Sequence, residues 1–296
     1  MIRNYFTLKL IKFKYLFRKF FFQLYNIYSS YSWGCSAGDE RAILVLFSGG
    51  MGAQILSAAV YFQLLSEGKE AYADFKYFEN IEHVAKVGNK GELSYWGWQL
   101  QSFGIQPCDF KKIPENIKFR NRLIIKNDAN KLADAISALA KESIRNHFID
   151  NEPINKIIPS EMQNNYLCIH IRRGDYYNVA SHMVSNESFL KAANQFFDFV
   201  SGVVVISDSE IDENFQKELR SMYRKAIFLD GINVAESHRV MRRARILICS
   251  NSQFSLSAAL LNPKGLIFLP KKWANDLNAG EIEAPISHSC TFQLLR

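Results

Sequence analysis

The chain has few cysteines, five among 296 residues, and none of them stands in a CxxC or Cys/His pattern. Their spacing does not suggest a zinc site, and an odd number of scattered cysteines favours a reducing compartment over a disulfide framework. Low-complexity tracts and internal repeats are also absent, which argues against disordered and repeat architectures. A chain of this length, 48% hydrophobic, is expected to form one large or two medium globular domains.

Acidic residues are missing from residues 1–33, which carry six Lys and Arg side chains interleaved with aromatic and aliphatic ones. This segment nearly accounts for the net charge of +7, so no nucleic-acid-binding surface is expected over the rest of the chain. Its charges recur too often for a spanning helix, and no signal-peptide cleavage site follows a clean apolar core. We expect a basic amphipathic helix on an anionic membrane surface, as in a peripheral protein of the cytoplasmic face. A helix docked on the protein's own body is the alternative.

The next part of the chain, residues 41–155, predicts an N-terminal domain with a parallel sheet. An apolar strand over Ala42–Phe47 is followed by a glycine turn, a helix over Gly52–Glu67 and a second strand over Ala71–Phe75. This order is that of a βαβ unit. A further helix is expected over Asp128–Phe148.

A polar stretch with two prolines, Asn151–Asn165, marks the predicted domain boundary, and residues 160–296 form the second domain. Strands and helices alternate there, which predicts a doubly wound α/β domain with its ligand at the carboxyl ends of the strands. The expected strands are Tyr166–Ile171, Val203–Ser207, Ile227–Leu229, Ile246–Cys249 and Leu266–Leu269. The expected helices are Glu187–Val200 (capped by Asn186), Ile211–Tyr223, Ala235–Arg245 and Ser255–Leu261.

Polar and charged side chains gather where three of these strands end. The first strand leads into His170–Asp175, which holds an imidazole, two adjacent guanidinium groups and a carboxylate. Guanidinium groups bind phosphate oxygens bidentately, so this pair is suited to a diphosphate. Hydroxyl and amide side chains precede the helix Ser255–Leu261, where free backbone N–H groups attract anions. The candidate ligand-binding residues are His170, Arg172, Arg173, Asp208, Ser250, Asn251, Ser252 and Ser255.

Each of these residues also has a purely structural explanation. Arg172 and Arg173 could be surface ion-pair partners, and Asp208 could be the N-cap of the next helix. The serines of Ser250–Ser255 could cap their own helix, and a single histidine in an apolar run, such as His170, is more often a core residue. Their joint occurrence at three neighbouring strand ends favours ligand binding.

The glycine-rich turn Gly49–Gly52 is less specific. It is not a Walker loop, and it lacks the GxGxxG spacing and acidic partner of a dinucleotide site. A tight turn with close strand–helix packing and a contact with a ligand are both open at this point.

The stretch His170–Tyr176 resembles the HxRRGDY motif of the alpha-1,2-fucosyltransferases, which form glycosyltransferase family 11. Other segments are similar to further family motifs and follow in the right order: Phe47–Gln54 resembles the GGLGNQ turn, Ile206–Asp208 the strand ending in Ser-Asp, Ser250–Ser255 the NSSFSWWG segment and Leu269–Trp273 the closing P-K-x-W.

This resemblance implies a GT-B-like α/β fold of two Rossmann-like domains, with the N-terminal domain on the acceptor side and the C-terminal domain binding the nucleotide sugar. It implies inverting transfer of fucose from GDP-fucose to a glycan hydroxyl, in alpha-1,2 linkage to galactose in surface polysaccharide or O-antigen synthesis, without metal or cofactor. By their positions in the motifs, Arg172 and Arg173 would bind the diphosphate, and His170 and Asp208 would contact the guanosine. Ser252 and Ser255 would complete the phosphate pocket. Arg172 and Asp175 are the catalytic candidates, Asp175 as an acceptor-side base or, as we prefer, an orienter of the arginines.

Two departures from the family pattern leave the substrates open. Ala53 stands where the family usually has Asn, in the half expected to face the acceptor, and Leu256–Ala258 replaces Trp-Trp-Gly beneath the donor. A donor other than GDP-fucose is one alternative. The others are a metal-dependent transferase that uses Asp208–Glu210 as an acidic motif, and a lectin-like or inactive GDP-sugar-binding protein.

Overall fold

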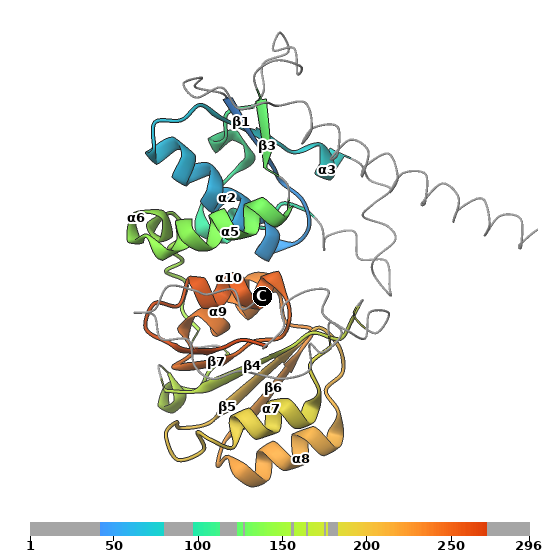
Figure 1. Cartoon of the computed structure of the whole chain (residues 1–296). Coiled ribbons are helices and arrows are strands. Elements are labelled where there is room, and N and C mark those ends of the chain that lie inside the picture. Colours follow the sequence, from blue (N-terminus) through green and yellow to red (C-terminus); the bar gives the residue numbers. More distant parts are fainter. Residues whose placement is uncertain are drawn as a thin grey trace, which may run out of the picture.

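The computed structural model describes residues 42–79, 97–112, 123–126, 128–154, 157–163, 165–174, 176 and 183–270, with the backbone alone for 123–126 and 128–130. Within these residues the chain forms two sheets whose strand pairs are all parallel. Figure 1 shows the two sheets one above the other, each with its own helices. The α/β class with two parallel-sheet domains, which the sequence predicts, is confirmed.

The N-terminal sheet has the order β2-β1-β3. Its strands are β1 (Ala42–Leu46), β2 (Ala71–Asp74) and β3 (Leu123–Lys126). Helix α2 (Met51–Ser66) connects β1 to β2, as the βαβ pattern predicts, while β3 was not expected from the sequence. The short elements of this domain are α3 (Lys76–Glu79), η2 (Leu100–Phe103) and η3 (Pro107–Asp109).

The single helix predicted over Asp128–Phe148 is wrong in its length. The chain instead forms α5 (Asp128–Ala140), α6 (Glu142–Arg145) and η4 (Asn146–Phe148). Lys141 has an extended backbone with ψ of 128°, which interrupts the helix. The Arg145 guanidinium donates to the carbonyl oxygens of Leu139 and Ala140 at 2.9 and 2.6 Å, and so satisfies acceptors that the break leaves without helical partners.

The C-terminal sheet has the order β6-β5-β4-β7-β8, so the chain winds outward from β4 first to one side and then to the other. Polar groups at the carboxyl ends of β4 and β7 therefore lie where the winding reverses, the usual ligand site of such sheets. Its strands are β4 (Leu167–Ile171), β5 (Val203–Ser207), β6 (Ala226–Asp230), β7 (Ile246–Ile248) and β8 (Leu266–Phe268). Its helices are η5 (Ser160–Met162), α7 (Asn186–Ala193), α8 (Glu213–Met222), α9 (Val234–Arg243) and α10 (Gln253–Leu260).

Helix α7 is shorter than the predicted Glu187–Val200, because turns replace its last residues. Its N-cap is Ser185, whose hydroxyl accepts a hydrogen bond from the Ser188 amide at 3.1 Å, and not Asn186 as predicted. Asn186 is instead the first residue of the helix, which leaves its side chain available for another contact.

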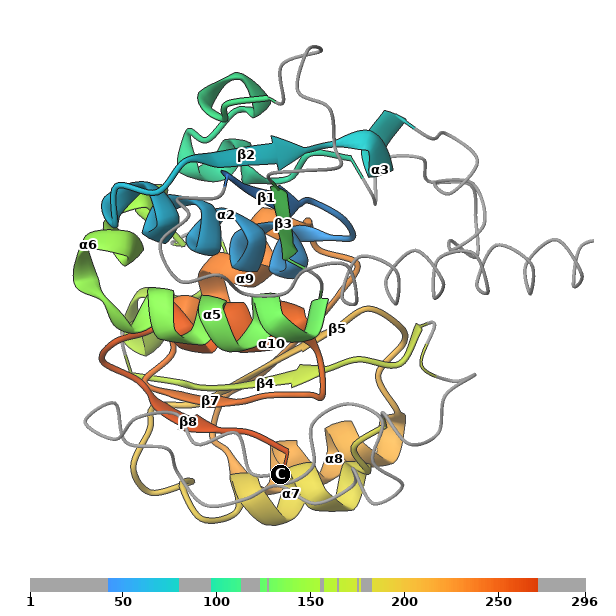
Figure 2. The same ribbon diagram turned by 45° about the horizontal axis from the view of Figure 1, so that its top comes forward.

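Helices α2 and α10 lie between the two sheets and pack against each other (Figure 2). Both are apolar around most of their circumference, which is typical of helices buried on all sides. Helix α10 contributes Leu256 and Leu260, together with Leu261 directly after it, to the core of the N-terminal domain. Its residues Ala258 and Ala259 pack on the C-terminal sheet. The cores of the two domains therefore meet along α10.

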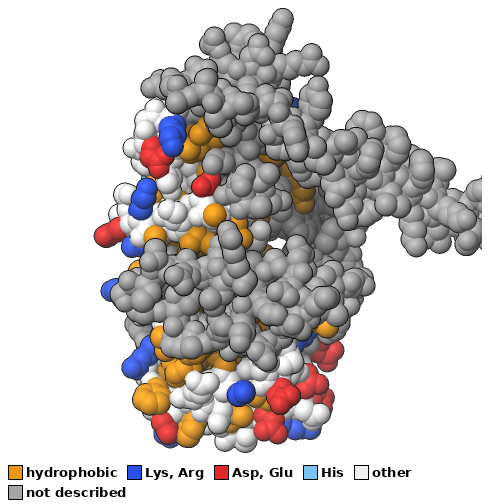
Figure 3. Space-filling model, in the orientation of Figure 1, with side chains coloured by type: hydrophobic (Ala, Val, Ile, Leu, Met, Phe, Trp, Pro, Cys, Tyr) orange, Lys and Arg blue, Asp and Glu red, His pale blue; other side chains and the backbone are white. Residues whose placement is uncertain are grey.

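The described helices are all too short or too polar to traverse a lipid bilayer. Residues 1–33 lie outside the described residues, so the basic membrane-surface helix stays a prediction. On the face drawn in Figure 3, basic and acidic side chains of the described surface are interspersed.

Candidate active site

Strand β4 presents alternate side chains to the two faces of its sheet. Leu167, Ile169 and Ile171 point into the core beneath α7 and α8, whereas Cys168 belongs to the core beneath α9 and α10. His170 lies on the same face as Cys168, because side chains alternate along a strand. Continuing this alternation beyond Ile171 places Arg172 on the α10 side and Arg173 on the α7 side.

His170 is buried, with 3% of its surface exposed, and its side chain is held by residues that follow the neighbouring strand β7. Its Nδ1 lies 2.7 Å from the Ser250 hydroxyl, and its ring is 5.5 Å from the ring of Phe254 on α10. Burial and, secondly, the charge of Arg172 lower the pKa of His170 to about 3. The imidazole is therefore neutral at neutral pH, and the β4 and β7 ends are joined without a buried charge.

The residues between β7 and α10 form a tightly bonded turn. The Ser252 hydroxyl caps α10 by accepting from the Phe254 amide at 3.2 Å. The Ser255 hydroxyl lies 3.0 and 3.2 Å from the carbonyl oxygens of Ser250 and Ser252. Ser255 is fully buried and Asn251 nearly so, which means that both shape the turn from within. A direct contact of these side chains with a ligand stays a prediction.

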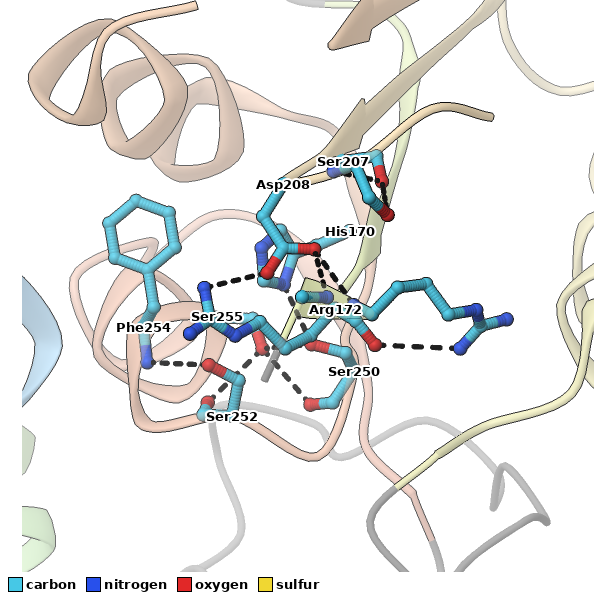
Figure 4. A network of polar contacts seen from close by, with 11 residues as sticks. His170, Arg172, Ser207, Asp208, Ser250, Ser252, Phe254 and Ser255 are labelled. Atoms are coloured by element: carbon cyan, nitrogen blue, oxygen red, sulfur yellow. Dashed lines mark hydrogen bonds and ion pairs between the residues drawn. The ribbon is translucent and has the colours of Figure 1, made fainter. Parts of the chain in front are cut away.

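Arg172 pairs with Asp208 across the ends of β4 and β5. The Arg172 Nη1 lies 2.8 Å from Oδ2 of Asp208, and both side chains are partly exposed, at 15% and 17%. Figure 4 shows Arg172 extending from β4 on the side of Ser250, Ser252 and Ser255. The Arg172 guanidinium also lies 5.5 Å from the ring of Tyr176. The Arg172 guanidinium, held by Asp208 and Tyr176, therefore lies partly exposed near the start of α10.

Asp208 also fixes the turn that follows β4. Its Oδ1 accepts hydrogen bonds from the backbone amides of Arg173 and Gly174 at 2.8 and 3.2 Å. A Cβ at Gly174 would lie 2.6 Å from Oδ2 of Asp208, so only glycine lets the carboxylate approach this closely. Asp208 is not the N-cap of the following helix, because Asp212 occupies that position.

Arg173 is directed to the opposite face of the sheet. Its Nη2 donates to Oδ1 of Asn186, the first residue of α7, at 2.8 Å. The two arginines that the sequence places side by side are thus separated by the strand, and the described contacts bring only Arg172 toward α10. Asp175, the remaining residue of the motif, lies outside the described residues.

Sequence reasoning missed a second buried histidine beside this site. His238 on α9 is fully buried, its Nε2 lies 3.1 Å from the Ser257 hydroxyl, and its ring is 5.3 Å from that of Phe254. Burial, then the positive charge of Arg242 and the repulsion that a protonated His238 would meet from the nearby His170 ring, hold the pKa of His238 well below its usual value. Phe254 therefore lies against both histidines. The only signal for His238 was its place on the apolar face of a helix, which most core residues share.

The glycine turn Gly49–Gly52 of the N-terminal domain lies next to the start of α10. Gln54 on α2 is fully buried and donates from Nε2 to the carbonyl oxygens of Gly49 and Gly97, at 2.9 Å each. Its Oε1 accepts from the Gln99 amide at 2.9 Å. The Gln54 side chain is thus committed to backbone groups of its own domain and holds the turn in place.

Together these residues form a candidate anion site at the carboxyl edge of the C-terminal sheet. A partly exposed guanidinium lies on the same face as the start of α10, whose first amides carry partial positive charge. Among the described residues, no three His, Cys, Asp or Glu side chains are grouped so as to hold a metal ion. The arrangement can therefore bind a phosphorylated ligand through the guanidinium and backbone N–H groups.

No curated protein matches the chain significantly in sequence. In structure it is similar to POFUT1 in complex with GDP-fucose, with a TM-score of 0.40 and 11% identity over 76% of this chain and 95% of that chain. It is also similar to the fucosyltransferase NodZ from Bradyrhizobium, with a TM-score of 0.39 and 14% identity over 78% of this chain and 95% of that chain. Both likenesses are too distant to assign a function.

The sequence match to a family is more extensive. The model described as glycosyl transferase family 11 matches residues 109–284, which is more than half of the chain. The match includes the ends of β4, β5 and β7 and therefore all the candidate ligand-binding residues of the C-terminal domain. The chain belongs to glycosyltransferase family 11.

Proposed function

We propose that this chain transfers fucose from GDP-fucose to a hydroxyl group of a glycan, with inversion at the anomeric carbon. Membership of glycosyltransferase family 11 and the resemblance of His170–Tyr176 to its HxRRGDY motif support this donor. The observation that carries the proposal is the partly exposed Arg172 guanidinium at the reversal point of the sheet, on the α10 side.

In the proposed reaction, Arg172 binds the diphosphate of the donor. As the bond between the anomeric carbon and GDP breaks, negative charge grows on the departing phosphate and positive charge grows on the sugar ring. A guanidinium already oriented by Asp208 at 2.8 Å stabilises that phosphate charge without having to reorganise. The amides at the start of α10 add to this stabilisation, so the step needs no metal ion.

The acceptor hydroxyl attacks the opposite face of the sugar, and its proton passes to solvent as the new bond forms. We propose that the acceptor lies on the side of the N-terminal domain and carries galactose, joined in alpha-1,2 linkage. Asp175 is proposed to orient the arginines. Residues 1–33 are proposed to hold the enzyme on the cytoplasmic face of a membrane, because they combine six cations with many aromatic side chains and no acidic residue.

The test is release of GDP or UDP from a panel of nucleotide sugars, with and without a glycan that ends in galactose. GDP-fucose should be turned over fastest, and a chelator such as EDTA should leave the rate unchanged. Faster turnover of another nucleotide sugar would show that this sugar, and not GDP-fucose, is the donor. Loss of activity in the chelator would favour a metal site at Asp208–Glu210, and GDP binding without turnover of any donor would favour an inactive binding protein.

A further inference from the structure

Gly52, in the first turn of α2, lies against the backbone of the other domain. A Cβ built at this position would be 2.5 Å from the carbonyl carbon and oxygen of Gln253 and from the amide nitrogen of Phe254. Carbon atoms in contact normally stay about 3.5–4.0 Å apart. The three atoms are main-chain atoms, so no side-chain rotation can make room. Any larger residue at position 52 must therefore move the domains apart by about 1 Å.

This contact is at the functional end of the domain interface. Gln253 begins α10, next to its cap Ser252, and the rest of the α2–α10 interface continues through Leu256 and Leu260 into the N-terminal core. The hydrogen bonds of His170, Asp208 and Ser252 described above all join residues of the C-terminal domain. A small separation at Gly52 would thus keep these hydrogen bonds and displace the N-terminal domain relative to the donor site.

We propose that Gly52 is a positioning residue that sets the distance between the donor site and the N-terminal domain. This inference rests on the proposed function, in which the acceptor lies on the N-terminal side. Transfer requires the acceptor hydroxyl and the anomeric carbon to be placed relative to each other to within a fraction of an ångström, whereas the candidate nucleotide-binding residues all lie in the C-terminal domain. Gly52 therefore acts on the rate of transfer and not on the affinity for the nucleotide.

The test is the variant Gly52→Ala, with kcat for transfer measured at saturating donor and GDP affinity measured by calorimetry. A displacement of about 1 Å should lower kcat about 10–100-fold, while the Kd for GDP stays within about twofold of the wild type. The assay uses whichever nucleotide sugar the wild-type enzyme turns over, so a wrong donor assignment does not affect the result. Unchanged kcat, or a parallel loss of GDP affinity, would overturn the proposal.

Gly68→Ala is the matched control. Gly68 follows the other end of α2, has a φ of +70°, and a Cβ there would meet nothing within 4 Å. This variant should lower the melting temperature through backbone strain but keep the wild-type kcat. If Gly52→Ala does not fold, Leu260→Val loosens the same α2–α10 interface about two turns from Ser252. It should lower kcat with unchanged GDP affinity, and an unchanged kcat in this variant would overturn the proposal in the same way.

Discussion

Asp208 binds Arg172 with one carboxylate oxygen, at 2.8 Å, and the turn after β4 with the other. One side chain at the end of β5 therefore fixes both the backbone and the guanidinium at the end of β4. The contact of Asp208 with the guanosine, which the family resemblance implies, stays a prediction. Asp208 thus orients Arg172 directly, and the orienting role of Asp175 stays a proposal.

The two functions of the Asp208 carboxylate can be separated by substitution. Asp208→Asn keeps an acceptor for the two backbone amides but removes the charge opposite Arg172, and should lower the free energy of unfolding by about 1 kcal/mol. Asp208→Ala removes both and should lower it by about 2–3 kcal/mol. Urea unfolding measures the difference. Equal losses in the two variants would mean that the amide contacts do not contribute to stability.

The loss of stability caused by a substitution at Gly174 should depend on whether Asp208 is present. In Gly174→Ala the new methyl group would lie 2.6 Å from Oδ2 of Asp208, closer than van der Waals contact allows, and should displace the carboxylate. Once the carboxylate is gone, the same methyl group has no clash. In a double-mutant cycle of Gly174→Ala and Asp208→Ala, we expect the combined loss of stability to be smaller than the sum by about 1 kcal/mol or more. Strict additivity would contradict the packing described here.

The buried histidines predict an acid-sensitive stability. The pKa of His170 is lowered to about 3 and that of His238 is also well below its usual value, so both stay neutral in the folded chain. An unfolded histidine binds a proton near pH 6.5. The unfolded state therefore binds more protons below that pH, and stability falls as pH decreases from about 6.5 toward the folded pKa, by about 1.4 kcal/mol per pH unit for each histidine.

His238→Gln tests this contribution, because glutamine retains a polar group toward Ser257 but does not titrate. The free energy of unfolding of this variant should fall less steeply between about pH 6 and pH 4 than that of the wild type, by about 1.4 kcal/mol per pH unit. His147, which stacks on Phe62 at the surface with ring centroids 4.1 Å apart, provides the control. His147→Gln should change the slope less, and parallel curves for His238→Gln and the wild type would refute the assignment.

Membrane association is expected to depend on residues 1–33. Deleting them should release the protein from vesicles that contain anionic lipid, while the rate with a soluble acceptor stays near that of the full chain. Cosedimentation with vesicles at two salt concentrations is the measurement. Continued binding of the shortened chain would assign membrane contact to another part of the molecule.

The sequence predicted the α/β fold because apolar strand runs and glycine turns are local signals. β4 and β5 were placed within one residue, and the polar ends of β4, β5 and β7 were expected at one sheet edge. The errors have local causes as well. The predicted helix over Asp128–Phe148 is broken at Lys141, where Arg145 satisfies the exposed carbonyl oxygens, and such a compensating contact leaves no trace in hydrophobic periodicity.

The arrangement of the site depends on contacts between distant residues, which sequence patterns do not reveal. The two adjacent arginines predict joint binding of a diphosphate. Side chains alternate between faces beyond the strand, and Arg173 donates to Asn186 on the α7 side, so a contact of Arg173 with the diphosphate stays a prediction. The partnership of Asp208 with the amides of Arg173 and Gly174 depends on which strands are neighbours. The fit of Gly52 against Gln253 joins residues of two domains, and no pattern within either segment indicates it.

The most direct test of the account is a calorimetric titration of GDP into the wild type, Arg172→Ala and Arg173→Ala. Arg172 shares the α10 face with His170 and Ser252, so its loss should weaken GDP binding by about 2–4 kcal/mol through lost charge-assisted contacts. Arg173 is held by Asn186 on the α7 side, and its loss should weaken binding about tenfold or less. Unchanged GDP affinity in Arg172→Ala, or equal losses in the two variants, would contradict the assignment of the donor site to this face of the sheet.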